Sequence, residues 1–175
     1  MRPSSRGIDI VAFSGRRVWS RVIELRSLSQ FSHVGIVCEI DGDDWVIEAL
    51  EGKGVRLVPL RCWMQWDGEF KAFALADPES GIPYCGVLRQ RVINFAAKRI
   101  GQEYASPLQL VRSFGFVTRW LCRVLRLRVD LEADRWFCSE LVAAALYSAG
   151  LFIPRDAAQM APGDVVRLPF LKEVS

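Results

Sequence analysis

Hydrophobic and polar residues alternate with a period of two over much of the first half of the chain. Five short runs show this alternation, at 8–13, 32–40, 44–50, 54–60 and 69–75. Alternation bounded by Asp, Gly and Pro is typical of β-strands joined by tight turns. The first run predicts a strand, and the last four predict a meander of antiparallel strands.

Helical spacing of the hydrophobic residues dominates after Pro83 and also occurs once before the second strand. The segments with this spacing are 16–28, 84–101, 106–129 and 134–150. Two of them, 84–101 and 134–150, end at a glycine, which is a common helix stop. Strands early in the chain and helices later predict an α+β fold, in which the helices pack against an antiparallel sheet.

The composition is that of a globular protein, since 51% of the 175 residues are hydrophobic and 25% are charged. This length fits a single domain, 1–175. The net charge of +3 is small, and the arginines are not interleaved with aromatic residues as in common RNA-binding signatures. We therefore expect no nucleic-acid partner.

No stretch of about 18 consecutive apolar residues occurs, which is the minimum for a membrane-spanning helix. The first residues also lack a secretory apolar region and cleavage site, so we expect a cytoplasmic protein. The five cysteines are irregularly spaced and share one histidine. This pattern argues against a disulfide framework and a structural zinc site. We expect reduced thiols and no metal or other cofactor.

The single histidine, His33, lies in the second predicted strand. The Asp-Gly pair at 41–42 predicts a two-residue hairpin turn into the third strand. If Ile40 pairs with Asp43, Glu48 becomes a diagonal neighbour of His33 on the same face of the sheet. A carboxylate beside an imidazole fixes its tautomer and stabilises the imidazolium, as a general base requires.

Gly35 shares this face and has no side chain, so another element can approach the sheet closely beside His33. A lone histidine on a strand is more often an ordinary buried or edge residue than a catalytic one. On these residues alone, both readings stay open.

Two cysteines, Cys85 and Cys138, lie near the starts of predicted helices. A helix N-terminus favours the thiolate and supplies N–H donors for an oxyanion. Cys138 also lies on an apolar helix face followed by alanines, where a cysteine is often just a small hydrophobic residue. Cys38 is at odd separation from His33, so it faces the other side of the sheet.

Three segments in a particular order resemble the permuted papain-like amidases, a branch of the NlpC-like cysteine peptidase superfamily. These are "FSHVGIV", "VIEA" and "FCSELV", with histidine first and cysteine last. In unpermuted members the cysteine helix precedes the histidine strand. Three further stretches, "GIDIVAFSG", "IGQEY" and "MAPGDVVRLP", are similar to other parts of the family pattern.

The resemblance implies a permuted papain-like fold spanning the whole chain, with Cys138 at a helix start facing the sheet. It implies Cys138 as nucleophile, His33 as general base, Glu48 as the residue that orients His33, and Tyr104 as a substrate or oxyanion contact. The reaction is then hydrolysis of an amide or peptide bond on a small amide, peptide or lipid-linked substrate. Two features depart from the family pattern: Ala105, where the family has an acidic residue, and the arginine-rich helical segment before Cys138. These departures bear on substrate recognition more than on Cys138, His33 and Glu48.

Two alternatives stay open: a lipid acyltransferase or thioesterase of the same fold at a membrane surface, and a non-catalytic module that retains the fold. The arginine-rich segment 108–128 bears on the first alternative. Its leucines and aromatic residues recur at helical spacing, and its arginines fall largely on the other side. Such a helix either covers the core with a solvated basic face or binds an anionic membrane surface peripherally.

Overall fold

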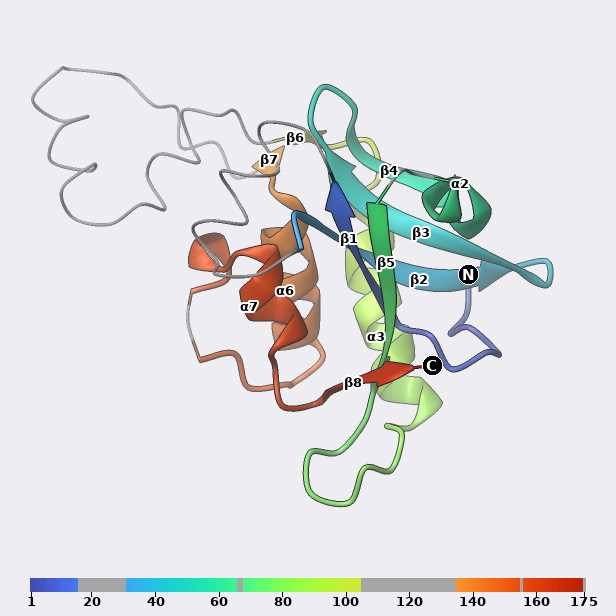
Figure 1. Cartoon of the computed structure of the whole chain (residues 1–175), viewed down its shortest axis with the longest axis vertical. Helices are drawn as coiled ribbons and strands as arrows, with labels where there is room; N and C mark the ends of the chain where they lie inside the picture. Colours follow the sequence, from blue (N-terminus) through green and yellow to red (C-terminus); the bar gives the residue numbers. More distant parts are fainter. Residues whose placement is uncertain (16–30, 66–67, 105–134, 155, 175) are drawn as a thin grey trace, which may run out of the picture.

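The computed structural model describes residues 1–15, 31–65, 68–104, 135–154 and 156–174 (Figure 1). The helices predicted at 16–28 and 106–129 lie outside the described residues. The described parts form an antiparallel sheet with helices packed against it, as the pattern predicted.

The main sheet has six strands in the order β4-β3-β2-β1-β5-β8, and each neighbouring pair is antiparallel. Its strands are β1 (Ile10–Gly15), β2 (His33–Ile40), β3 (Asp43–Leu50), β4 (Gly54–Pro59), β5 (Gly68–Leu75) and β8 (Leu171–Val174). A separate short parallel pair joins β6 (Glu103–Tyr104) to β7 (Arg135–Trp136). The described helices are α2 (Leu60–Met64), α3 (Gly86–Ala97), α6 (Cys138–Ser148), α7 (Pro162–Val166) and the 3₁₀ turn η1 (Ala157–Gln159).

The five predicted strands are all present, but the predicted meander is wrong at its last member. Strand β5 pairs with β1 and not with β4. The short helix α2 follows β4 directly and leads the chain away from that edge. Five residues are too few for helical periodicity to be visible, so the sequence pattern missed α2, and it also missed the edge strand β8.

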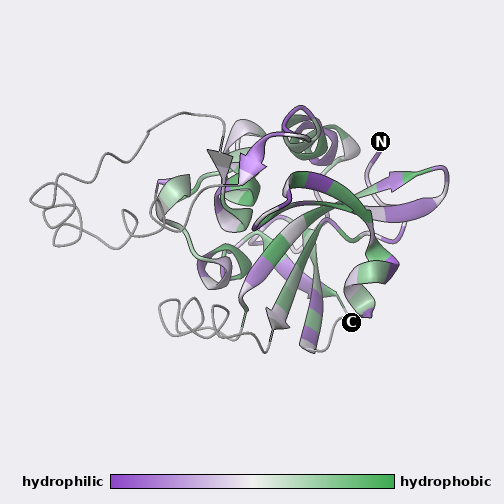
Figure 2. Cartoon of the chain, turned by 90° about the horizontal axis from the view of Figure 1, so that it is seen from above, coloured by the Kyte–Doolittle hydropathy of each residue, from purple (hydrophilic) through white to green (hydrophobic). Residues whose placement is uncertain are grey.

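The hairpin between β2 and β3 has the predicted turn and register. Asp41 and Gly42 both adopt positive φ, 53° and 90°, as a type I′ turn requires. Ile40 pairs with Asp43, and the register continues to Ile36 opposite Ile47. Figure 2 shows hydrophilic residues gathered at the tip of this hairpin, while the strands nearer the centre are mostly hydrophobic.

The two faces of the sheet are covered differently, as the alternation of side chains requires. One face packs against α3 and α6 through residues such as Val34, Ile36 and Leu141. The other face carries Val37 and packs against α2. Figure 1 shows α6 with α7 on one side of the strands and α2 on the other.

Helix α6 buries the apolar stripe that its sequence predicted. The stripe consists of Cys138, Leu141, Val142, Ala145 and Ala149, each at most 5% exposed. The small alanine side chains allow the helix to lie close to the strands. Gly150 follows at φ 97°, which fits the predicted glycine stop. Among the residues that the structure describes, no helix is long and apolar enough to cross a membrane.

Candidate active site

His33 and Glu48 are in direct contact, as the hairpin register predicted. The Nε2 atom of His33 lies 2.7 Å from Oε2 of Glu48. The Glu48 carboxylate is fully buried, and the His33 side chain is only 11% exposed. Because His33 opens β2 and Glu48 lies near the end of β3, the tight 41–42 turn fixes their distance.

Arg56 also binds Glu48, and sequence reasoning missed it. Arg56 lies directly across from Glu48 in the β3–β4 register. Its Nε and Nη2 atoms donate to Oε1 of Glu48 at 2.9 and 2.7 Å. Burial raises the pKa of Glu48, but the hydrogen bonds and charges of His33 and Arg56 outweigh burial and lower it. Opposite charges on facing strands were the available signal.

Trp63 of α2 covers one face of the imidazole and is a second residue that sequence reasoning missed. Its ring stacks on His33 with 5.1 Å between ring centroids and an interplanar angle of 30°. This approach depends on Gly35, as predicted. A Cβ added at Gly35 would lie 3.2 Å from Cζ2 of Trp63 and would overlap a methyl group of Val46.

Cys138 is the first residue of α6 and lies beside His33. A side-chain hydrogen bond joins Cys138 to His33. Burial lowers the pKa of His33, but the charge and hydrogen bond of Cys138 and those of Glu48 outweigh it and raise that pKa to about 10. His33 therefore carries its proton at neutral pH.

The start of α6 is ordered by its neighbours in the chain. Phe137 is the N-cap residue in extended conformation, and its backbone N–H donates to Oε2 of Glu140 at 3.3 Å. The carbonyl of Phe137 accepts the first helical hydrogen bond, from Leu141, at 2.9 Å. The backbone N–H of Cys138 belongs to the first turn, whose N–H groups have no helical acceptor.

The structure places the other candidate cysteines away from His33. Cys85 is the N-cap of α3 and is exposed. Cys38 is buried in the cluster with α3 and α6, whereas His33 stacks on Trp63 at the opposite face. Burial raises the pKa of Cys38 to about 11, which keeps it a thiol. Cys138 is the cysteine that hydrogen-bonds His33.

Tyr104 lies close to the start of α6. It pairs with Trp136 in the β6–β7 ladder, and its ring meets Phe137 edge-on at 5.6 Å between centroids. Burial and the charge of Cys138 raise the pKa of Tyr104, so it stays a neutral phenol. The four residues predicted for the site are thus brought into one region.

Comparisons with known proteins give the family and the fold of the chain. A model of the permuted papain-like amidase enzymes of the YaeF/YiiX, C92 family matches residues 9–119. The chain belongs to this family. The matched segment contains His33, Glu48 and Tyr104, and it ends before Cys138. Membership gives the general class, that of papain-like amidases and cysteine hydrolases.

A solved structure shows the same fold over the whole chain. The chain is similar to the crystal structure of the metalloprotein YiiX from Escherichia coli O157:H7, with a TM-score of 0.68. Sequence identity is 19%, and the alignment covers 100% of this chain and 98% of that chain. No curated protein sequence matches the chain. The permuted papain-like fold predicted from the sequence is confirmed.

Proposed function

We propose that this chain hydrolyses amide or peptide bonds through a thioester on Cys138. The observation that carries the proposal is the continuous set of contacts from Cys138 to His33 and from His33 to Glu48. Acyl transfer requires a nucleophile that is hydrogen-bonded to a base, and a base that is hydrogen-bonded to an orienting group. An imidazolium beside a sulfur favours the reactive thiolate.

The first half of the reaction forms the acyl-enzyme. The Cys138 thiolate attacks the carbonyl carbon, and the carbonyl oxygen takes the negative charge. We assign the backbone N–H of Cys138 as a hydrogen-bond donor to that oxygen. His33 then gives its proton to the leaving nitrogen as the C–N bond breaks, which leaves a thioester on Cys138 and a neutral imidazole.

The second half regenerates the enzyme. Neutral His33 takes a proton from water as the water oxygen attacks the thioester carbon. The C–S bond breaks, the carboxylic acid leaves, and the thiolate–imidazolium pair returns. Glu48 holds the imidazole ring and stabilises its charged form, and we assign Tyr104 to contact with the substrate or the oxyanion.

The structural neighbour is described as a metalloprotein, which makes a bound metal ion the alternative chemistry for this site. Among the residues that the structure describes, no group of three or more His, Cys, Asp and Glu side chains is arranged to hold a metal ion. The oxygens of Glu48 already accept from His33 and Arg56. These residues do not fit a metal site, and no step of the proposed reaction is routed through one.

The substrate class is a small amide, a peptide or a lipid-linked amide, acted on by a protein that we place in the cytoplasm. Acyl transfer to or from lipid stays the second candidate because of the basic amphipathic pattern at 108–128. That segment lies outside the described residues. Co-sedimentation with anionic and with neutral vesicles separates the two: binding to anionic vesicles alone favours the lipid candidate, and no binding to either removes it.

Trapping of the acyl-enzyme tests the proposed mechanism. Incubation with p-nitrophenyl acetate should release a burst of p-nitrophenolate and leave one acetyl group per chain. The acetyl group should map to the peptide that contains Cys138 and should be removed by hydroxylamine, as a thioester is. Acetylation mainly at another residue, or none at all, would overturn the proposal.

A further inference from the structure

Arg56 contacts the site through Glu48, and the proposed reaction gives this contact no role. It lies in β4, directly opposite Glu48 in the strand register. Two of its nitrogens donate to the same carboxylate oxygen, Oε1, at 2.9 and 2.7 Å. The other oxygen, Oε2, is the one that meets His33 at 2.7 Å.

The carboxylate of Glu48 must stay ionised and must keep a fixed orientation, and a single hydrogen-bond partner does not ensure both. Its side chain is fully buried, and burial favours the neutral acid over the carboxylate. A neutral acid would place a proton on an oxygen and weaken its ability to accept from the imidazole. A charge-assisted hydrogen bond from a guanidinium stabilises the ionised form, and its planar donors also fix the carboxylate plane.

Each oxygen of the Glu48 carboxylate has its own partner, and this arrangement fixes the orientation of the carboxylate toward His33. Because Oε1 is held by Arg56, the Glu48 side chain keeps the rotation in which Oε2 points at His33. The hairpin geometry makes this contact short, since directly opposed residues on adjacent strands have Cβ atoms about 4.5–5.5 Å apart. Removal of Arg56 would leave Oε1 buried and without this donor.

We propose that Arg56 is a positioning residue of the reaction, which acts through Glu48 to hold His33 in its working orientation. This inference rests on the proposed function, because it assigns a role within the same site. Arg56 contacts neither the sulfur nor the substrate in this scheme. The competing explanation is an ordinary cross-strand ion pair that contributes to folding and not to chemistry.

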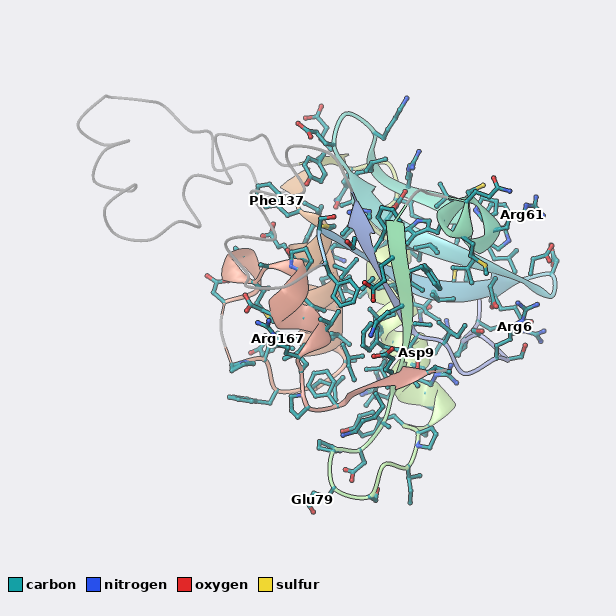
Figure 3. The ribbon with its side chains drawn as sticks, viewed as in Figure 1. Arg6, Asp9, Arg61, Glu79, Phe137 and Arg167 are labelled. Atoms are coloured by element: carbon teal, nitrogen blue, oxygen red, sulfur yellow. The ribbon has the colours of Figure 1, made fainter. Side chains whose placement is uncertain are left out.

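A double-mutant cycle separates these explanations. The assay is the second-order rate constant for alkylation of Cys138 by iodoacetamide at pH 7, with the adduct located by mass spectrometry. The variants are Arg56→Met, Arg56→Lys, Glu48→Gln and the Glu48→Gln/Arg56→Met double variant. Arg61→Met is the matched control, since Arg61 is exposed and lies on α2, across the molecule from Phe137 (Figure 3).

A positioning role predicts an effect that depends on Glu48. Arg56→Met should slow alkylation about tenfold, in the range of residues coupled through one hydrogen-bond network. In the Glu48→Gln background the same change should alter the rate less than about twofold, because the group through which Arg56 acts is gone. Arg56→Lys keeps the charge without the planar fork, so its rate should fall between those of wild type and Arg56→Met.

Four results would overturn the inference, and one of them would also contradict the proposed function. An Arg56→Met rate equal to that of Arg61→Met, or an equal slowing in both backgrounds, would leave the proposed function standing and reduce Arg56 to a structural pair. A wild-type Cys138 that reacts like an ordinary thiol, with a pKa of about 8.5, would remove both. If Arg56→Met does not unfold cooperatively in urea, the Arg56→Lys rate decides, and wild-type reactivity there overturns the inference.

Discussion

In the part of the chain that the structure describes, α3 and α6 each begin beside a cysteine, and the two cysteines have different surroundings. Cys85 is the N-cap of α3 and is exposed, while Cys138 opens α6 and is buried. Both helices follow an extended residue, so both offer free N–H groups and a favourable dipole. Only at α6 does the structure add a hydrogen bond to an imidazole. A helix start therefore does not make a site by itself.

The difference comes from which end of the sheet each helix begins at. Figure 1 shows α3 starting next to the loop that follows β5, whereas α6 starts next to β7, at the opposite end of the strands. His33 is the first residue of β2 and lies at the α6 end, with Glu48 held beside it by the hairpin. The sheet supplies His33, the proposed general base, and a helix start can take part in the proposed reaction only where it meets that residue.

Exchanging each cysteine for serine should give the largest contrast between the two helix starts. Cys138→Ser should lower hydrolysis of an activated ester or amide by at least about a thousandfold, as expected when a nucleophile is removed. Cys85→Ser should leave the rate within about twofold of wild type, because Cys85 has no part in the chemistry. Loss of activity in Cys85→Ser with Cys138→Ser still active would reverse the assignment.

Removal of the imidazole should affect one cysteine and spare the other. His33→Ala should abolish turnover and slow iodoacetamide labelling of Cys138, since the sulfur loses the cation that favours its thiolate. Labelling of exposed Cys85 in the same sample serves as the internal control and should not change. If His33→Ala destabilises the fold while the remaining folded protein keeps full specific activity, His33 is a structural residue.

Much of the difference between the starts of α3 and α6 could be predicted from the sequence. The Asp-Gly turn at 41–42 predicts a strand register that places Glu48 beside His33, and the structure has both the register and the contact. Local chemistry of this kind is readable because a hairpin is short and its geometry is fixed by the turn. Cys138 needed the family resemblance, because the packing of a helix start against a distant strand is not a local property.

The features that escaped sequence reasoning depend on contacts between remote segments. Trp63 sits on a helix of five residues, too short to predict from periodicity, yet its ring stacks on His33. Strand β5 joins β1 because α2 intervenes after β4, and nothing in its own alternation distinguishes the two edges. Arg56 was within reach, since it faces Glu48 across the second hairpin.

A pH titration of His33 tests whether the imidazole at the start of α6 is held in its charged form. As the single histidine of the chain, it has an imidazole NMR signal that needs no assignment by mutation. Burial lowers its pKa, but Cys138 and Glu48 raise it from 6.5 to about 10, so the signal should not titrate between pH 6 and 8.5. In Cys138→Ala one of the raising partners is gone, and the pKa should fall. Titration near 6.5 in wild type would contradict the site geometry.

The same shift has a consequence for folding stability. Between 6.5 and about 10 the folded chain holds a proton that the unfolded chain has lost, so the free energy of unfolding should decrease as pH rises through this window. Below the unfolded value of 6.5 the contribution is fully present. Urea unfolding of wild type and His33→Gln at pH 6 and 9.5 measures it, and the two proteins should differ less at the higher pH. An equal difference at both pH values would argue against a raised pKa.

The smallest expected effect concerns the two tyrosines that accompany the two helix starts. Tyr104 lies against Phe137 at the start of α6, and Tyr84 immediately precedes Cys85 at the start of α3. If the Tyr104 hydroxyl contacts the substrate or the oxyanion, Tyr104→Phe should lower kcat/KM by about five- to tenfold, the effect of one lost neutral hydrogen bond in the transition state.

Tyr84→Phe is the matched control, since it removes the same atom beside a helix start that has no imidazole. It should leave kcat/KM unchanged, and neither substitution should alter the urea midpoint much, because the ring that packs is kept. Equal, small losses in both variants would show that the Tyr104 hydroxyl has no special part in the reaction. A loss confined to Tyr104→Phe and carried by kcat would place its hydroxyl at the oxyanion, whereas a loss carried by KM would place it on the bound substrate.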